Sequence, residues 1–301
     1  MALLHTHTEG EGILHVLEEV FLHGLLDTLK LVPFLFLTYL LMEFIEHRSA
    51  DGTERFMRRA GAFGPAVGGL LGAIPQCGFS AAASNLFAGR VITVGTLVAV
   101  FLSTSDEMLP ILISGQIPVT TVLLIVLYKA TVGILVGFAL DLAIRFSKRE
   151  REEINIDVIC DEDNCHCERG IFYSAIHHTL TIALFVLVVT WAINGVVYLV
   201  GEDTLGEWVG AMPVLSHTVA ALVGLIPNCA ASVVLSTLCA EGIISVGVMM
   251  AGLFSNAGVG LLVLFRVNKR LRENFFIVGL LLAVGILFGL LGDVLFPASL
   301  F

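Results

Sequence analysis

Residues 72–107 read GAIPQCGFSAAASNLFAGRVITVGTLVAVFLSTSDE, and a second version of this stretch begins 152 residues later. Aligned without a gap, residues 70–112 and 222–264 are identical at sixteen of 43 positions. Composition alone would pair one apolar residue with another, but it does not explain the shared polar pattern P-[QN]-C-x-x-S-x-x-x-S. The sequence therefore indicates an internal duplication. Interrupted apolar segments at matching places in two halves are typical of the binding sites of secondary transporters.

The composition places the chain in a membrane. Of its 301 residues 57% are hydrophobic and 14% are charged, and its mean hydropathy of +0.94 is above that of water-soluble domains. Six apolar stretches are long enough to cross a hydrocarbon core of about 30 Å: 28–45, 91–114, 120–144, 171–200, 243–265 and 275–295. Two more, 62–88 and 212–240, are interrupted by prolines. The first residues are acidic and His-rich, so we expect no cleavable signal peptide.

The distribution of basic residues predicts the topology. Lys and Arg gather at 48–59, 90, 145–169 and 266–272, which the positive-inside rule assigns to the cytoplasm. Three full crossings between the first and third of these clusters would put them on opposite sides. The count agrees if 62–88 enters the membrane and returns, with its break at Pro75, because proline interrupts a helix. Each arm then reaches about half the bilayer at ~1.5 Å per residue.

The same interpretation of 212–240 gives a hairpin that enters from outside. We therefore predict an all-α polytopic membrane protein with two inverted-topology repeats. Each repeat has three full transmembrane helices and one Pro-broken re-entrant hairpin, about ten segments in all, with both termini outside. The predicted parts are an interfacial amphipathic helix (1–26), the first repeat (27–146), a cytoplasmic acidic Cys/His loop (147–170) and the second repeat (171–301). The alternative is one long Pro-kinked span at 62–88, which leaves the charge bias imperfect.

The quoted stretch resembles the arsenic-type permease superfamily, whose signature is a Pro-x-Cys-x-x-Ser hairpin followed by a Gly-rich span that ends in a broken, Ser-rich stretch. More narrowly, residues 27–295 resemble the ten-segment heavy-metal exporters, which are labelled manganese transporters or arsenic efflux proteins. The resemblance implies efflux of a metal or metalloid across a bacterial inner membrane. One departure weighs against thiolate-dominated arsenic binding. The organoarsenical branch carries a denser Cys cluster in its first hairpin, whereas Gly78 and Phe79 follow the lone Cys77 here.

The adjacent carboxylates Asp106 and Glu107 are the sharpest site candidates, because ionisable groups at membrane depth are costly and usually functional. The nearby Pro110 and the Ser/Thr run before them predict locally unwound helix. In the second half Gly258 stands in register with Asp106, so only one half carries the acidic pair. The alternative is the acidic end of a span near the outer surface.

His177 and His178 match Leu26 and Asp27 at an offset of 151. Related by a twofold axis, Asp27 of one half and a histidine of the other would face one central cavity. Imidazole and carboxylate together suit Mn²⁺, Zn²⁺ or Fe²⁺ better than arsenic. Interfacial capping near the ends of the spans is the alternative.

Further polar and soft groups lie at the interruptions, and they are candidate ligands or partners for backbone groups freed there: Gln76, Cys77, Asn85, Asn228, Cys229 and Asn256. Lys129 lies in the middle of a span. We expect Asp106, Glu107 or Asp141 as its partner, in a proton relay or a purely structural ion pair. Asp106, His178 and Lys129 are the candidates for proton coupling.

The loop at 157–168 reads DVICDEDNCHCE. Cys160, Cys165, His166 and Cys167 could hold one Zn²⁺-like ion, although the spacing matches no known zinc module. An acidic linker without metal is the alternative.

The sequence favours a secondary-active exporter of a Mn²⁺-like divalent metal, proton-coupled and working by alternating access around a central site at the two hairpin tips. An arsenite or organoarsenical efflux permease is the alternative, and an intramembrane enzyme is a remote one. No G-x-x-x-x-G-K-[ST] phosphate loop occurs, so ATP bound to this chain does not drive transport. We expect the lipid bilayer and the transported metal or metalloid as partners. No cofactor and no nucleic acid is expected, and a homodimer is left open.

Overall fold

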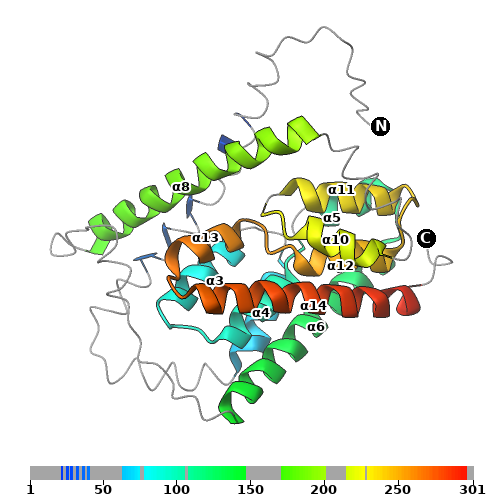
Figure 1. Ribbon diagram of the computed structural model, residues 1–301, viewed down its shortest axis with the longest axis horizontal. Helices are drawn as coiled ribbons and strands as arrows, with labels where there is room; N and C mark the ends of the chain where they lie inside the picture. The colour runs from blue at the N-terminus through cyan, green and yellow to red at the C-terminus, as the bar shows by residue number, and fades with distance from the viewer. Residues whose placement is uncertain are drawn as a thin grey trace, which may run out of the picture.

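The structure is a computed structural model, shown in Figure 1. It describes residues 22, 25–26, 28–29, 32–33, 36–37, 39–40, 63–74, 78–105, 108–146, 171–200, 215–227 and 229–296. Every regular element in these ranges is a helix. Within these described ranges, four stretches are long and apolar enough to cross a membrane: Val94–Ser114, Val119–Phe146, Val246–Val267 and Leu271–Leu295. The prediction of an all-helical polytopic membrane protein is therefore confirmed at the level of fold class.

The helices fall into two sets. The first half contains the helix Phe63–Gly72, α3 (Gly78–Ala88), α4 (Val94–Ser103), α5 (Met108–Ser114) and α6 (Val119–Phe146). The second half contains α8 (Ile171–Val200), α10 (Ser216–Gly224), α11 (Cys229–Ala240), α12 (Val246–Ser255), α13 (Val259–Val267) and α14 (Leu271–Leu295). Both stretches predicted as Pro-broken contain two short helices, on either side of Pro75 and Pro227. The bounds of α4 and α12 differ by 152 residues at both ends.

The turn after α3 and the turn after α11 have the same backbone geometry. Val91 N donates to Leu86 O at 2.8 Å, and Ile243 N donates to Leu238 O at 2.9 Å. The residue before each donor has a positive φ, 60° at Arg90 and 73° at Gly242. Glycine adopts this region without cost, whereas an arginine there is uncommon.

Helices α4 and α12, which follow these turns, begin at the hydroxyl N-caps Thr93 and Ser245, and an aspartate from a long helix binds the start of each. Gly95 N of α4 donates to Asp141 Oδ1 of α6 at 3.0 Å, and Gly247 N of α12 donates to Asp293 Oδ1 of α14 at 2.8 Å. These carboxylates accept from backbone groups that a helix start leaves unpaired, and they complement its dipole.

The helix pair α4 and α6 and the helix pair α12 and α14 are inverted relative to each other, because α4 and α12 begin at opposite ends of the bundle. Arg90 Nη1, just before α4, forms an ion pair at 3.0 Å with Glu273 Oε2 in the first turn of α14. The start of α4 therefore lies at the end of the bundle where α14 begins. The start of α12 lies beside Asp293, at the other end of α14, about 30 Å from Glu273 at 1.5 Å per residue. It follows that α4 and α12 begin at opposite ends of the molecule.

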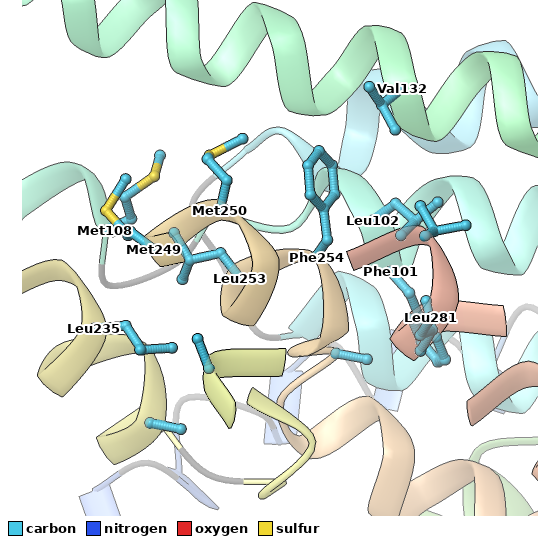
Figure 2. Close-up of a cluster of buried hydrophobic side chains, with 14 of the residues drawn as sticks. Phe101, Leu102, Met108, Val132, Leu235, Met249, Met250, Leu253, Phe254 and Leu281 are labelled. Atoms are coloured by element: carbon cyan, nitrogen blue, oxygen red, sulfur yellow. The ribbon is translucent and has the colours of Figure 1, made fainter. Parts of the chain in front are cut away.

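Two apolar cores hold the helices together. The larger one is built mainly from α4, α6, α11, α12 and α14, and Figure 2 shows its centre, where Met249, Met250 and Phe254 lie among side chains of the neighbouring helices. The smaller core joins the first span, α3, α8 and α13 through small and β-branched residues. In Figure 1, α8 accordingly runs along the edge of the bundle, next to α13.

Candidate functional site

Two of the membrane-length stretches are interrupted at depth, and polar side chains bond the backbone there. The α4–α5 stretch leaves helical conformation after Ser103, and the α12–α13 stretch does so after Ser255. Ser103 Oγ donates to Ala99 O at 2.7 Å, and Asn256 Oδ1 accepts from Gly258 N at 2.8 Å. Non-helical backbone at membrane depth requires such internal partners. The side-chain oxygen of Asn256 therefore serves as a partner for a backbone N–H that the break leaves free, which is the alternative role considered above for these amides.

Lys129 of α6 lies between the two interruptions. Its side chain is fully buried. Its Nζ donates to Thr104 O at the end of α4 and, at 3.1 Å, to Leu253 O in the last turn of α12. The same Nζ lies 5.7 Å from the centroid of the Phe254 ring, within cation–π range. One ammonium thus contacts the broken helices of both halves.

The expected pairing of Lys129 with Asp141 is wrong. Both residues belong to the continuous helix α6, twelve positions apart, which is about 18 Å along the axis. Asp141 instead accepts from Thr93 Oγ1 at 2.6 Å and from Gly95 N, so it fixes the start of α4.

The hairpin arm α3 packs against α13 of the other half. Ser84 Oγ lies 2.9 Å from Ser80 O and 2.8 Å from Gly260 O, so its proton can be donated to either carbonyl. A Cβ added at Gly260 would lie 2.7 Å from Ser80 Cβ, closer than carbon atoms approach without displacement. Glycine at 260 therefore permits this contact.

The arm α3 also carries Asn85, a predicted site residue. Asn85 is fully buried, and its Oδ1 accepts from Tyr39 OH of the first span at 3.1 Å. Its Nδ2 has no hydrogen-bond partner among the residues that the structure describes. Asn85 thus faces the smaller core, whereas Asn256 lies at the α12 break, and the structure shows no direct bond between them.

The remaining predicted residues divide into two groups. His177 is half-buried on α8, and the helical backbones of α8 and α11 include His178 and Cys229, whose side chains are outside the described residues. The others lie outside the described residues altogether: Asp27, Gln76, Cys77, Asp106, Glu107, Asn228, Cys160, Cys165, His166 and Cys167. Within the described part of the chain, no three His, Cys, Asp or Glu side chains are close enough to hold a metal ion.

The sequence interpretation missed the acidic residue Asp293 and its partner His217. His217 Nε2 of α10 lies 2.8 Å from Asp293 Oδ2, which ties the second hairpin to α14. Asp293 stands 152 residues after Asp141. Extending the internal alignment beyond residue 264 would have paired the two aspartates and revealed their shared role.

Long apolar helices, interrupted spans and a buried ammonium at the interruptions define a multi-pass α-helical membrane protein. The model of the family described as "Putative, 10TM heavy-metal exporter" matches residues 17–204. The chain belongs to this family, as its sequence resemblance predicted, and the family supports a metal-transport function in general. No curated protein and no solved structure matches the chain.

Proposed function

We propose that this protein is a secondary-active transporter that exports a Mn²⁺-like divalent metal ion and couples export to protons. The single observation that carries the proposal is the arrangement at Lys129. There, the interruptions of α4–α5 and α12–α13 meet at one buried ammonium, although α4 and α12 begin at opposite ends of the molecule. Broken helices that approach a common point from two sides provide a central site for alternating access.

The proposed ligands combine carboxylate, imidazole and amide groups. Asp106 and Glu107 follow Ser105 directly, between the end of α4 and the start of α5, so their position in the chain favours the central site. Asp27, His177 and His178 are the proposed contributors from the first span and α8. The other proposed ligands come from the two hairpins and from the α12 break: Gln76, Cys77, Asn85, Asn228, Cys229 and Asn256. Hard oxygen donors with imidazole favour Mn²⁺ over arsenite, which prefers thiolates. For the proton, we propose Asp106, His178 and Lys129 as carriers.

The inverted arrangement of two repeats with re-entrant hairpins belongs to the same proposal. The Arg90–Glu273 ion pair supports it, because both residues adjoin basic clusters that the positive-inside rule assigns to the cytoplasm. Single spans at both 62–88 and 212–240 would put Arg90 outside and residues 266–272 inside, on opposite sides of the membrane. An ion pair at 3.0 Å is incompatible with that separation.

Transport into everted membrane vesicles tests the function. We expect Mn²⁺ to accumulate when a proton gradient is present and to be released when the gradient is collapsed. Arsenite, Zn²⁺ and Fe²⁺ assayed under the same conditions define the preference. Accumulation of arsenite without any divalent metal would establish the alternative permease, and no transport of either class would refute the proposal.

Cysteine labelling from each side of the membrane tests the topology. Val91 and Ile243 occupy the two equivalent turns and are 152 residues apart. Placed singly in a variant without native cysteines, V91C should react with a membrane-impermeant maleimide from the cytoplasmic side only. I243C should react from the outside only. Labelling of both positions from the same side would exclude inverted repeats.

A further inference from the structure

The surroundings of the Lys129 ammonium have the character of a cation site made by the backbone. The last carbonyl groups of a helix have no N–H partner within that helix. They carry the negative end of its dipole. Thr104 is the C-cap of α4, and Leu253 lies two residues before the end of α12. Unwound carbonyls and half-helix C-termini of this kind coordinate monovalent cations in secondary transporters.

The amine comes from only one half. At the position 152 residues after Lys129 stands Leu281, which is also fully buried but brings no charge. A single ammonium therefore serves the ends of both broken helices, with the Phe254 ring on one side of it. Because a lysine side chain has three N–H donors and no acceptor, carbonyl oxygens are suitable partners.

We propose that the ends of α4 and α12 form a monovalent-cation site, and that Lys129 Nζ is its built-in occupant. The amine takes the place that a sodium ion would otherwise fill, so transport needs no sodium ion. The site itself rests on the contacts described above, and only this consequence for transport rests on the proposed function.

Removing the side chain vacates the site and gives the test. Lys129→Ala deletes three methylene groups and the nitrogen, which together correspond to n-propylammonium. We expect the unfolding temperature of the purified variant, in detergent and without sodium or potassium, to fall by about 5 °C. Sodium ions or n-propylammonium should restore at least half of that loss, while the wild-type protein should not respond. Neutral n-propanol and tetramethylammonium, which has no N–H group, should restore nothing.

Two further variants separate a cation site from general packing. Leu281→Ala makes a comparable hole at the equivalent position, and its loss of stability should be insensitive to every cation. Lys129→Met keeps the volume of the aliphatic part of the side chain without the ammonium group, so it should fold, be less stable than wild type and show no response to cations. The proposal is overturned if Lys129→Ala is insensitive to both sodium and n-propylammonium, or if Lys129→Met is as stable as wild type.

The transport measurement is kept separate from the stability measurement. In vesicles, wild-type transport should be equal with and without sodium, and a strict requirement for sodium would refute the built-in occupant. Absence of metal transport by the wild-type protein would refute the proposed function but leave the cation response of Lys129→Ala as an independent test of the site.

Discussion

The α4–α5 interruption and the α12–α13 interruption share a framework and differ in charge. Ser103 and Ser255, 152 residues apart, both donate to a carbonyl four residues earlier. After these serines the sequences of the two halves differ. Asp106 and Glu107 follow in the first half, whereas Gly258 and Val259 stand at the equivalent positions in the second. The comparison shows that the helix break occurs in both halves, whereas the acidic pair occurs only in the first.

The largest expected effect is on the charged half. We predict that Asp106→Ala or Glu107→Ala abolishes metal efflux, because each removes a ligand and charge compensation from a poorly solvated site. Leaving a buried charge without its partner costs several kcal/mol, on the order of 3–5. Cys77→Ser and Cys229→Ser, as controls, should only weaken efflux. Efflux assays on the four variants decide the matter. Loss in both Cys variants with active acidic variants would indicate arsenic as the substrate.

The next prediction concerns the close contacts of α4 with α6 and of α12 with α14, where equivalent substitutions should reduce the stability of the protein to a similar extent. An added Cβ at Gly137 would lie 2.5 Å from Gly95 O, and one at Gly289 would lie 2.8 Å from Gly247 O. Gly137→Ala and Gly289→Ala should therefore each destabilise the protein by about 1–3 kcal/mol, the usual cost of overpacking.

Gly279 on α14 is the control, since nothing lies within 4 Å of an added Cβ there. Gly279→Ala should be neutral or stabilise the helix by up to about 1 kcal/mol. Thermal unfolding of the three variants gives the comparison. A large loss of stability in only one of Gly137→Ala and Gly289→Ala would show that the equivalent helix contacts of the two halves do not contribute equally to stability.

The smallest effect is expected in the segment that joins the halves. Replacing Cys160, Cys165, His166 and Cys167 together by Ser should leave the maximal transport rate intact and lower the apparent affinity by roughly tenfold at most, about 1.4 kcal/mol. Any coupling from this loop to the site would lie within the range of about 1–3 kcal/mol usual for allosteric effects. A transport titration across metal concentrations measures both quantities. A reduced maximal rate would make the loop essential, and an unchanged curve would make it a linker.

Much of the framework could be predicted from the sequence, because it depends on local signals. Pro75 and Pro227 indicated where helices are interrupted, and the 152-residue offset paired α4 with α12 before their bounds were known. The partners of Lys129 could not be predicted in the same way. The two partners described here, Thr104 O and Leu253 O, are backbone carbonyls, which every residue possesses, so no side chain in the sequence marks them.

The predicted metal ligands are a different case. Most of them, including Asp106 and Glu107, lie outside the described residues, so their grouping around one ion stays a prediction. Asn85 shows the limit of sequence reasoning where its surroundings are described. Its amide type made it a candidate ligand, which stays a prediction, but nothing in the sequence indicated its bond to Tyr39 in the smaller core.

The close contact of α3 with α13 bears on the ancestry of the chain. Position 260 requires a residue without a Cβ, because Ser80 lies against it, yet the first half carries Met108 at the corresponding place. Two copies of the first half could therefore not dock on each other as the first half docks on the second. An ancestor assembled from identical subunits would have needed a small residue at both positions. With methionine at 108, the two halves are not interchangeable at this contact.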